Sequence, residues 1–200
     1  VAARRPDLVL VYPSEANRAA VAQLEALGIP TAALKQDAIA DWRGTVRWVA
    51  RAAGVPERAD SLLADFDRRL AAARVADTAA GPTVFIAVGA NPPLAIGAGS
   101  FVSELVTLAG GRNAFGDIRG PSAAVSLEAI VARRPSVVMV LGPDSVIADV
   151  SMRPGWRAMA AVRERRVLAV DGSEFNRPSP RLPDAVRRLA ARLAPLGAAP

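Results

Sequence analysis

The chain of 200 residues contains no cysteine and no histidine, and only 4% of its residues are aromatic. Zinc, manganese and iron sites in proteins usually draw on imidazole or thiolate ligands, so a site built on those ligands is excluded. Ser-His-Asp and Cys-His catalysis are excluded for the same reason, and no disulfide can form. Cysteine usage therefore gives no indication of the cellular compartment.

The sequence also lacks long apolar runs and the pattern of a nucleic-acid-binding protein. No run of about 18 apolar residues is present, so we expect no membrane-spanning segment. No charged region followed by an apolar stretch indicates a signal peptide, and Val1–Pro6 is typical of a helix end, so we expect the sequence to begin inside a longer protein. The net charge of +6 comes mainly from arginine, and few aromatic residues lie between the arginines to stack on bases. The composition therefore does not favour nucleic-acid binding.

Strand and helix patterns alternate through the first forty residues. Residues 7–11 predict a buried strand, and residues 15–27 carry apolar side chains at helical spacing up to Gly28. Residues 29–34 predict a second strand. Strand, helix, strand is the unit of a parallel sheet, which indicates an α/β lobe.

The middle of the chain is predicted to be helical. Residues 41–53 predict a helix that ends at Gly54, and Pro56 suits the first turn of another helix that reaches about Val75. Twenty helical residues span about 30 Å, so this second helix is expected to be a stiff connector.

The rest of the chain is predicted to form a second lobe with parallel strands. Strands are expected at 83–88, 136–141 and 166–170, with helical patterns between them and a final helix from Pro180. We therefore predict an α/β fold with two parallel-sheet lobes joined by a long rigid helix. The expected domains are residues 1–40 for the first lobe, 41–80 for the helical connector and 81–200 for the second lobe.

A short internal repeat relates the two lobes. Residues 3–11 (ARRPDLVLV) match residues 132–140 (ARRPSVVMV) at an offset of 129. Each copy predicts a helix end, a proline turn and a buried strand, because proline restricts the residue before it to non-helical conformations. The apolar run that follows the proline in both copies favours the interpretation that the lobe is duplicated.

The most informative motif is Gly89-Ala90-Asn91-Pro92-Pro93-Leu94-Ala95-Ile96-Gly97, which follows an apolar strand and precedes a helical pattern. Its glycines and prolines shape a backbone that can lie against a ligand. Together with the repeat and the connector, it resembles class III substrate-binding proteins, the helical-backbone family that serves ABC importers, and among them the cobalamin-binding branch. The resemblance also includes these segments in the same order: GAGSF (97–101), LAGGRNAF (108–115), VSLEAI (125–130), RPGW (153–156) and RPSPRL (177–182).

The resemblance implies a binding function rather than an enzyme. It implies cobalamin or a related corrinoid held between two lobes, no cofactor, an ABC permease as partner, and a periplasmic or surface-anchored location. The family's first lobe begins with a further strand and helix, so the N-terminal lobe is expected to be truncated here. A haem or a ferric siderophore is the alternative ligand, and without histidine any metal is expected to arrive already chelated.

The expected ligand-binding residues lie in loops. Tyr12 ends the first strand, where ligands sit in open α/β sheets. Gly89, Asn91 and Gly97 shape the motif loop, although turn chemistry alone also accounts for them. Trp156 is also expected, although the sequence allows it to face either the core or the ligand. The last members, in the loop after the final strand, are Glu174, Phe175 and Arg177. The resemblance implies that this loop contributes an aromatic and an arginine contact. A guanidinium can bind amide carbonyls, phosphate or propionate.

Two acidic residues are expected to contact the permease. Glu15 and Asp144 are related by the same offset of 129, and each is expected to open the helix after an equivalent strand. The resemblance implies that one acidic residue per lobe meets arginines of the permease. The alternative is that each only stabilises a helix N-terminus.

Overall fold

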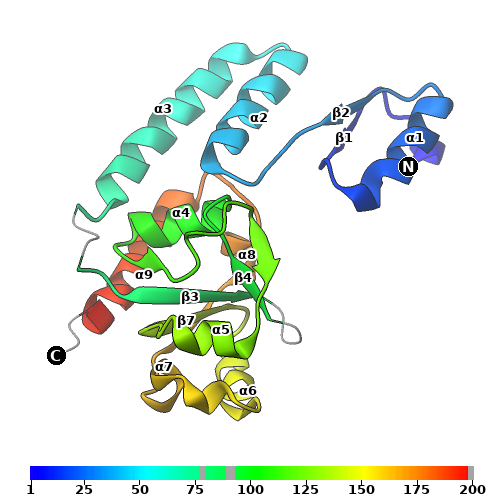
Figure 1. Cartoon of the computed structure of the whole chain (residues 1–200). Coiled ribbons are helices and arrows are strands. Elements are labelled where there is room, and N and C mark those ends of the chain that lie inside the picture. Colours follow the sequence, from blue (N-terminus) through cyan, green and yellow to red (C-terminus); the bar gives the residue numbers. More distant parts are fainter. Residues whose placement is uncertain (77–79, 89–92, 198–200) are drawn as a thin grey trace. The chain divides into compact units, whose positions relative to one another are not determined.

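The computed structural model describes residues 1–76, 80–88 and 93–197, and the chain forms two compact units, Val1–Ala59 and Asp60–Pro200 (Figure 1). Each unit combines helices with a sheet, which confirms the expected α/β class. The boundaries expected at residues 40 and 80 stay a prediction. No helix within the described ranges is both long enough and apolar enough to cross a membrane.

The first unit is built around a strand–helix–strand motif. After a 3-10 turn at Ala2–Arg4 come β1 (Val9–Val11), α1 (Glu15–Ala26), β2 (Thr31–Ala33) and α2 (Ile39–Ala52). Strands β1 and β2 are parallel, with Val9 opposite Thr31, as the alternating patterns predicted. Gly28 has a φ of 70°, and this left-handed conformation ends α1, because glycine adopts it without steric cost.

Helix α3 (Pro56–Ala73) begins at the proline that the sequence singled out. Gly54, with a φ of 72°, separates it from α2. The side chains of Leu63, Phe66 and Leu70 are buried along one face at helical spacing.

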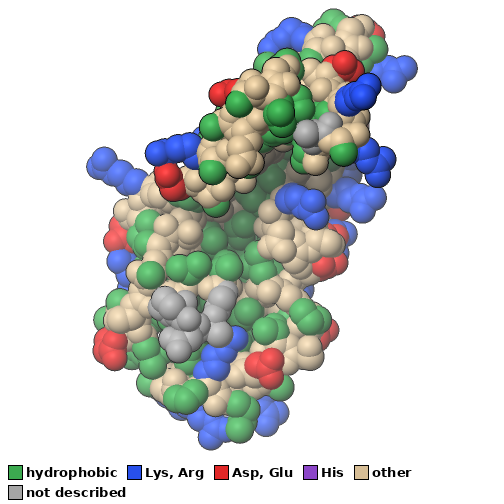
Figure 2. Space-filling model, turned by 90° about the vertical axis from the view of Figure 1, so that its right-hand side faces the viewer, with side chains coloured by type: hydrophobic (Ala, Val, Ile, Leu, Met, Phe, Trp, Pro, Cys, Tyr) green, Lys and Arg blue, Asp and Glu red, His purple; other side chains and the backbone are tan. Residues whose placement is uncertain are grey.

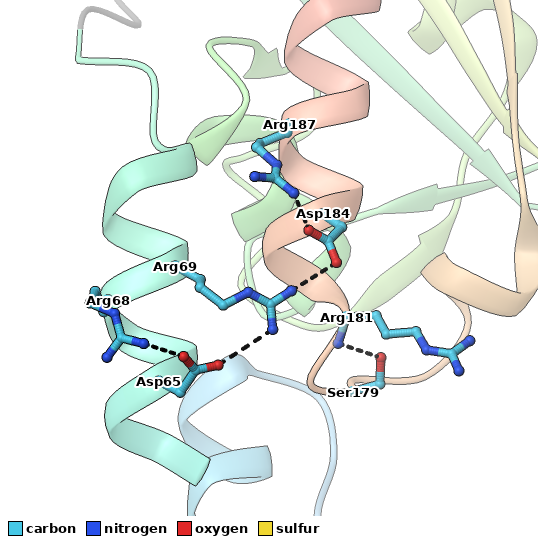
Figure 3. Close-up of polar contacts among 7 residues, drawn as sticks. All are labelled: Asp65, Arg68, Arg69, Ser179, Arg181, Asp184 and Arg187. Carbon is cyan, nitrogen blue, oxygen red and sulfur yellow. Dashed lines mark hydrogen bonds and ion pairs between the residues drawn. The ribbon is translucent and has the colours of Figure 1, made fainter. Parts of the chain in front are cut away.

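The C-terminal half of α3 is tied to α9 (Leu182–Gly197) by ion pairs (Figure 3). Arg69 donates to Asp184 at 2.8 Å and also lies 3.5 Å from Asp65 of its own helix. Asp184 in turn pairs with Arg187, and Asp65 pairs with Arg68. From Asp60 onward α3 belongs to the second unit, and these charges tie it to α9 within that unit.

The second unit contains a six-stranded sheet with a parallel centre. Strands β3 (Thr83–Val88), β7 (Val137–Leu141) and β8 (Val167–Val170) are parallel neighbours in the order β3-β7-β8. Their apolar runs are almost wholly buried, as expected for parallel strands that are covered on both faces.

The outer part of this sheet differs from the expected parallel lobe. Strand β4 (Leu94–Ile96) pairs antiparallel with β3, and β6 (Ser122–Ala124) pairs antiparallel with β4. A two-residue strand, β5 (Arg112–Asn113), pairs with the start of β3. The motif loop therefore turns the chain back on itself, and the sheet is mixed.

Helices cover both faces of this sheet (Figure 1). Helices α4 (Phe101–Leu108) and α9 lie on one face, and α5 (Leu127–Ala132), α6 (Val146–Met152) and α7 (Ala160–Arg163) lie on the other. On the latter face Phe85 packs against Phe115 and Trp156, with ring centroids 5.7 and 6.0 Å apart. A 3-10 turn at Trp156–Ala158 and the short helix α8 (Gly172–Phe175) complete the unit.

The internal repeat is visible in the backbone. Arg5 has a φ of 44° and Arg134, its counterpart at the offset of 129, has a φ of 47°. Both residues stop a helical turn just before a proline and a strand. Arg165, with a φ of 57°, does the same before β8 without a proline. An arginine with a positive φ thus follows the end of a helical segment at each of these three positions.

Candidate ligand-binding site

The carboxyl ends of the parallel strands are where open α/β sheets bind ligands, and in the first unit Tyr12 lies there. It follows β1, and 41% of its surface is exposed. Its hydroxyl donates to Asp37 Oδ1 at 2.6 Å, and Lys35 Nζ lies 3.2 Å from Asp37 Oδ2. The hydrogen bond to Asp37 is the main cause that raises the pKa of Tyr12 above its ordinary value.

In the second unit, the carboxyl ends of β7 and β8 border a depression of about 650 Å³. Its walls come from the loop after β7, from α8 and from α9. The lining includes Gly142, Asp144, Asp171, Ser173, Asn176 and Arg192. The Arg192 guanidinium donates to the carbonyl of Ala169, so α9 is fixed to the end of β8. Both hydrogen-bond donors and acceptors therefore line this depression.

The loop that contains Glu174, Phe175 and Arg177 is anchored at several points. Asp171 accepts a hydrogen bond from the Ser173 backbone N–H at 2.8 Å and caps α8. That backbone bond is the largest cause that lowers the pKa of Asp171. Glu174 forms an ion pair with Arg188 of α9. Glu174 thus has a partner within the protein, and its ligand contact stays a prediction.

Phe175 and Trp156 are both buried, whereas a ligand contact was expected of Phe175 and Trp156 was left open between core and ligand. Phe175 is 3% exposed and Trp156 is 4% exposed. Trp156 packs on Phe85, and the Arg153 guanidinium covers its ring at 4.9 Å from the centroid. Burying a large aromatic ring is strongly favourable, so both side chains hold the surrounding loops in place.

Arg177 is the member of this loop that stays available. Its side chain is exposed, and its guanidinium makes no ion pair or hydrogen bond with any residue in the described ranges. The anchors at Asp171, Glu174 and Phe175 precede it directly in the chain. The loop thus presents a free guanidinium from a fixed base.

The motif loop is described only in its second half. Gly89 and Asn91, both expected to shape the ligand site, lie outside the described residues. Gly97 is described, and its N–H donates to the Pro121 carbonyl at 3.0 Å. A Cβ at Gly97 would lie 2.3 Å from Gly120 O, so its lack of a side chain is required by packing.

The two expected permease contacts are both exposed. Glu15 opens α1 and pairs with Arg18, with about three quarters of both side chains exposed. Asp144 lies two residues before α6 and is exposed at the rim of the depression at the carboxyl edge. Glu15 opens its helix as the repeat predicted, whereas α6 begins only at Val146, two residues after Asp144.

Sequence reasoning missed Asp37, Asp171 and Arg188. An aspartate that ends a strand before Gly-Ser is a helix-capping signature, so Asp171 carried a readable signal. Asp37 and Arg188 carried none, because their partners are 25 and 14 residues away. Within the described ranges, no three acidic residues gather as a metal site would require.

The charges on the face drawn in Figure 2 are interspersed. Basic and acidic side chains both occur there among apolar and uncharged atoms.

Comparisons with known proteins agree on one family. The family described as "Periplasmic binding protein" matches residues 1–173. A vitamin B12-binding protein of Yersinia pestis (strain Pestoides F) is 30% identical over 195 residues, which cover 97% of this chain and 68% of the relative. The structure of a periplasmic heme-binding protein from Roseiflexus sp. RS-1 has a TM-score of 0.82 at 26% identity, covering 98% of this chain and 78% of that one. The periplasmic vitamin B12-binding protein of Vibrio cholerae shares the fold, with a TM-score of 0.72 at 22% identity over 98% of this chain and 76% of that one.

Proposed function

Because this chain belongs to the periplasmic binding protein family, we propose that it is the substrate-binding component of an ABC importer and carries cobalamin or a related corrinoid. The observation that carries the corrinoid assignment is the 30% identity to a vitamin B12-binding protein across 97% of the chain. The role is to bind the ligand and deliver it to the permease, in the periplasm or tethered at the cell surface. No chemical step is part of this function.

The exposed groups at the carboxyl edges are suited to such a ligand. Tyr12 offers a half-exposed aromatic ring whose orientation is fixed by Asp37. Arg177 offers a fork of donors for the amide carbonyls or the phosphate of a corrinoid. In this proposal Trp156, Phe175 and Glu174 position the loops, and Gly97 lets two backbone segments approach each other.

Calorimetric titration of the full-length protein with cyanocobalamin tests the proposal. We expect one-site binding with a dissociation constant below about 1 µM. Arg177→Ala is expected to weaken binding about tenfold or more, since a charge-assisted contact is lost. Arg74→Ala is the matched control, because Arg74 is also exposed and its guanidinium makes no hydrogen bond or ion pair with a described residue. No heat with cyanocobalamin would refute the corrinoid assignment.

Haem or a ferric siderophore is the second candidate. The similarity to a heme-binding protein at 26% identity and a TM-score of 0.82 favours it. Tyr12 is the only tyrosine of the chain, and a phenol is a known type of haem ligand. Hemin and a ferric hydroxamate are therefore titrated in parallel, and saturation by one of them alone would transfer the assignment to that ligand.

A further inference from the structure

A second depression lies at the opposite edge of the sheet, at the amino ends of β7 and β8. Its volume is about 540 Å³, within the usual range for small-molecule sites. Its apolar part is formed by Val131, Pro135 and Met159, and Met159 is only 2% exposed. None of the residues assigned to the corrinoid ligand lines it.

Arginines supply every charged group in the lining of this depression. Arg134 follows α5 by two residues, Arg163 ends α7, and Arg166 directly precedes β8. The nearby Glu164 pairs with Arg166 at 2.5 Å, and it offsets one of the three charges. The depression thus keeps an excess of positive charge, which favours an anion.

Two of these guanidinium groups are held in place by backbone carbonyls. Arg163 Nη1 donates to Ala158 O at 2.8 Å and to Arg157 O at 3.1 Å. Arg166 Nε donates to Ser136 O at 2.8 Å. Each group keeps further N–H donors, and fixing a side chain beforehand lowers the entropic cost of binding.

Arg134 differs from these two. An arginine can serve only to bind the last carbonyls of a helical turn, and Arg163 does so for the 3-10 turn Trp156–Ala158. The Arg134 guanidinium makes no hydrogen bond or ion pair with a described residue, although it lines the depression. Its left-handed backbone ends the helix, but its guanidinium binds no carbonyl of a described residue, so helix capping does not account for the side chain.

We infer that this depression binds a phosphate group through Arg134, Arg163 and Arg166, in addition to the proposed corrinoid site. Guanidinium groups match phosphate oxygens with paired hydrogen bonds. The phosphate can belong to a free phosphoester or to the headgroup of an anionic lipid. The apolar wall formed by Val131, Pro135 and Met159 would contact the carbon substituent of either one.

The test is a titration of the full-length protein, followed by NMR chemical shifts, with inorganic phosphate and with dihexanoyl phosphatidylglycerol below its micelle concentration. We expect saturable shifts with dissociation constants of about 1 mM or lower, weakening as salt is added. Tighter binding of the lipid by about tenfold would identify a lipid headgroup as the source, and equal binding a free phosphoester.

The paired variants are Arg134→Ala and Arg165→Ala. Both arginines have a positive φ before a strand, so the two changes perturb the backbone alike, but Arg165 does not line the depression. Arg134→Ala should weaken phosphate binding about tenfold, while Arg165→Ala should not change it. Cyanocobalamin binding should be the same in both variants. Equal phosphate affinity for the two variants, or no saturation by either probe up to about 20 mM, would overturn the inference.

Discussion

Gly97 illustrates how packing can fix a residue that sequence reasoning assigns to a ligand. Its N–H is bonded to Pro121, and a Cβ would meet the carbonyl oxygens of Gly120 at 2.3 Å and Ile118 at 2.6 Å. Both obstacles are backbone atoms, which cannot rotate away as a side chain does. The glycine therefore joins the end of β4 to the loop before β6, whatever ligand the protein carries.

Gly97→Ala is therefore expected to lower the free energy of unfolding by about 1–3 kcal/mol through overpacking. Gly120→Ala is the matched control, because the nearest atom to its Cβ is 3.9 Å away and its φ is not positive. That change should be neutral or stabilise by about 0.5 kcal/mol. Urea denaturation measures both. If Gly97→Ala unfolds at the same urea concentration as the control, the packing argument fails.

At the level of single residues, the sequence shows which side chains can bind a ligand better than it shows whether they face the core or the solvent. It identified Arg177 as a donor in a loop after a strand, and the structure leaves that side chain exposed. It could not decide that Trp156 and Phe175 turn inward. That outcome depends on Phe85 and on α9, whose positions are set by tertiary packing rather than by neighbouring residues.

At the level of elements, the sequence predicted those with strong periodicity. The central strands lie within a few residues of their expected bounds. So do the helix that begins at Pro56 and the two helices that end before Gly28 and Gly54. Strands β4 and β6 were not predicted. Each strand has only three residues and is flanked by glycine or proline, so it carries no clear local pattern. Each forms because it pairs with a neighbouring strand of the sheet.

The ion pair between Arg69 and Asp184 is the element-scale contact most open to a direct test. It joins residues 115 positions apart, from α3 to α9. In a double-mutant cycle with Arg69→Ala and Asp184→Asn, we expect a coupling of about threefold in the unfolding equilibrium constant, decreasing with added salt. Arg68→Ala removes only a pair within α3 and serves as the control. Strict additivity of the two changes would show that the pair does not fasten α3.

The same pair predicts how stability depends on pH. Burial by itself raises the pKa of Asp184, but Arg69 and Arg187 outweigh it, and the pKa lies below its ordinary value. A carboxyl with a lowered pKa in the folded state stabilises the protein above its unfolded pKa of about 4. This contribution is lost as the pH falls below about 4. The stability difference between the wild type and Asp184→Asn should therefore shrink in acid.

At the scale of the whole molecule, the repeat makes the two units comparable. Each has a left-handed arginine, a parallel strand and an exposed acidic residue at the same spacing, which gives the pairs Arg5 with Arg134 and Glu15 with Asp144. A permease with two related halves would meet one acidic residue from each unit. We therefore extend the proposed function to a docking role for Glu15 and Asp144.

This docking role separates ligand binding from transport, and charge reversal can test that separation. Glu15→Lys combined with Asp144→Lys is expected to leave the affinity for cyanocobalamin unchanged and to lower uptake through the cognate permease by about tenfold or more, because like charges would then face the permease arginines. Each single change should give an intermediate loss. Asp149→Lys is the control, since Asp149 is also exposed and lies on α6, the helix that follows Asp144. A double variant that binds ligand normally and still transports at the full rate would contradict the docking role. Glu15 would then serve only to stabilise the start of α1, where an acidic side chain is favourable without any partner.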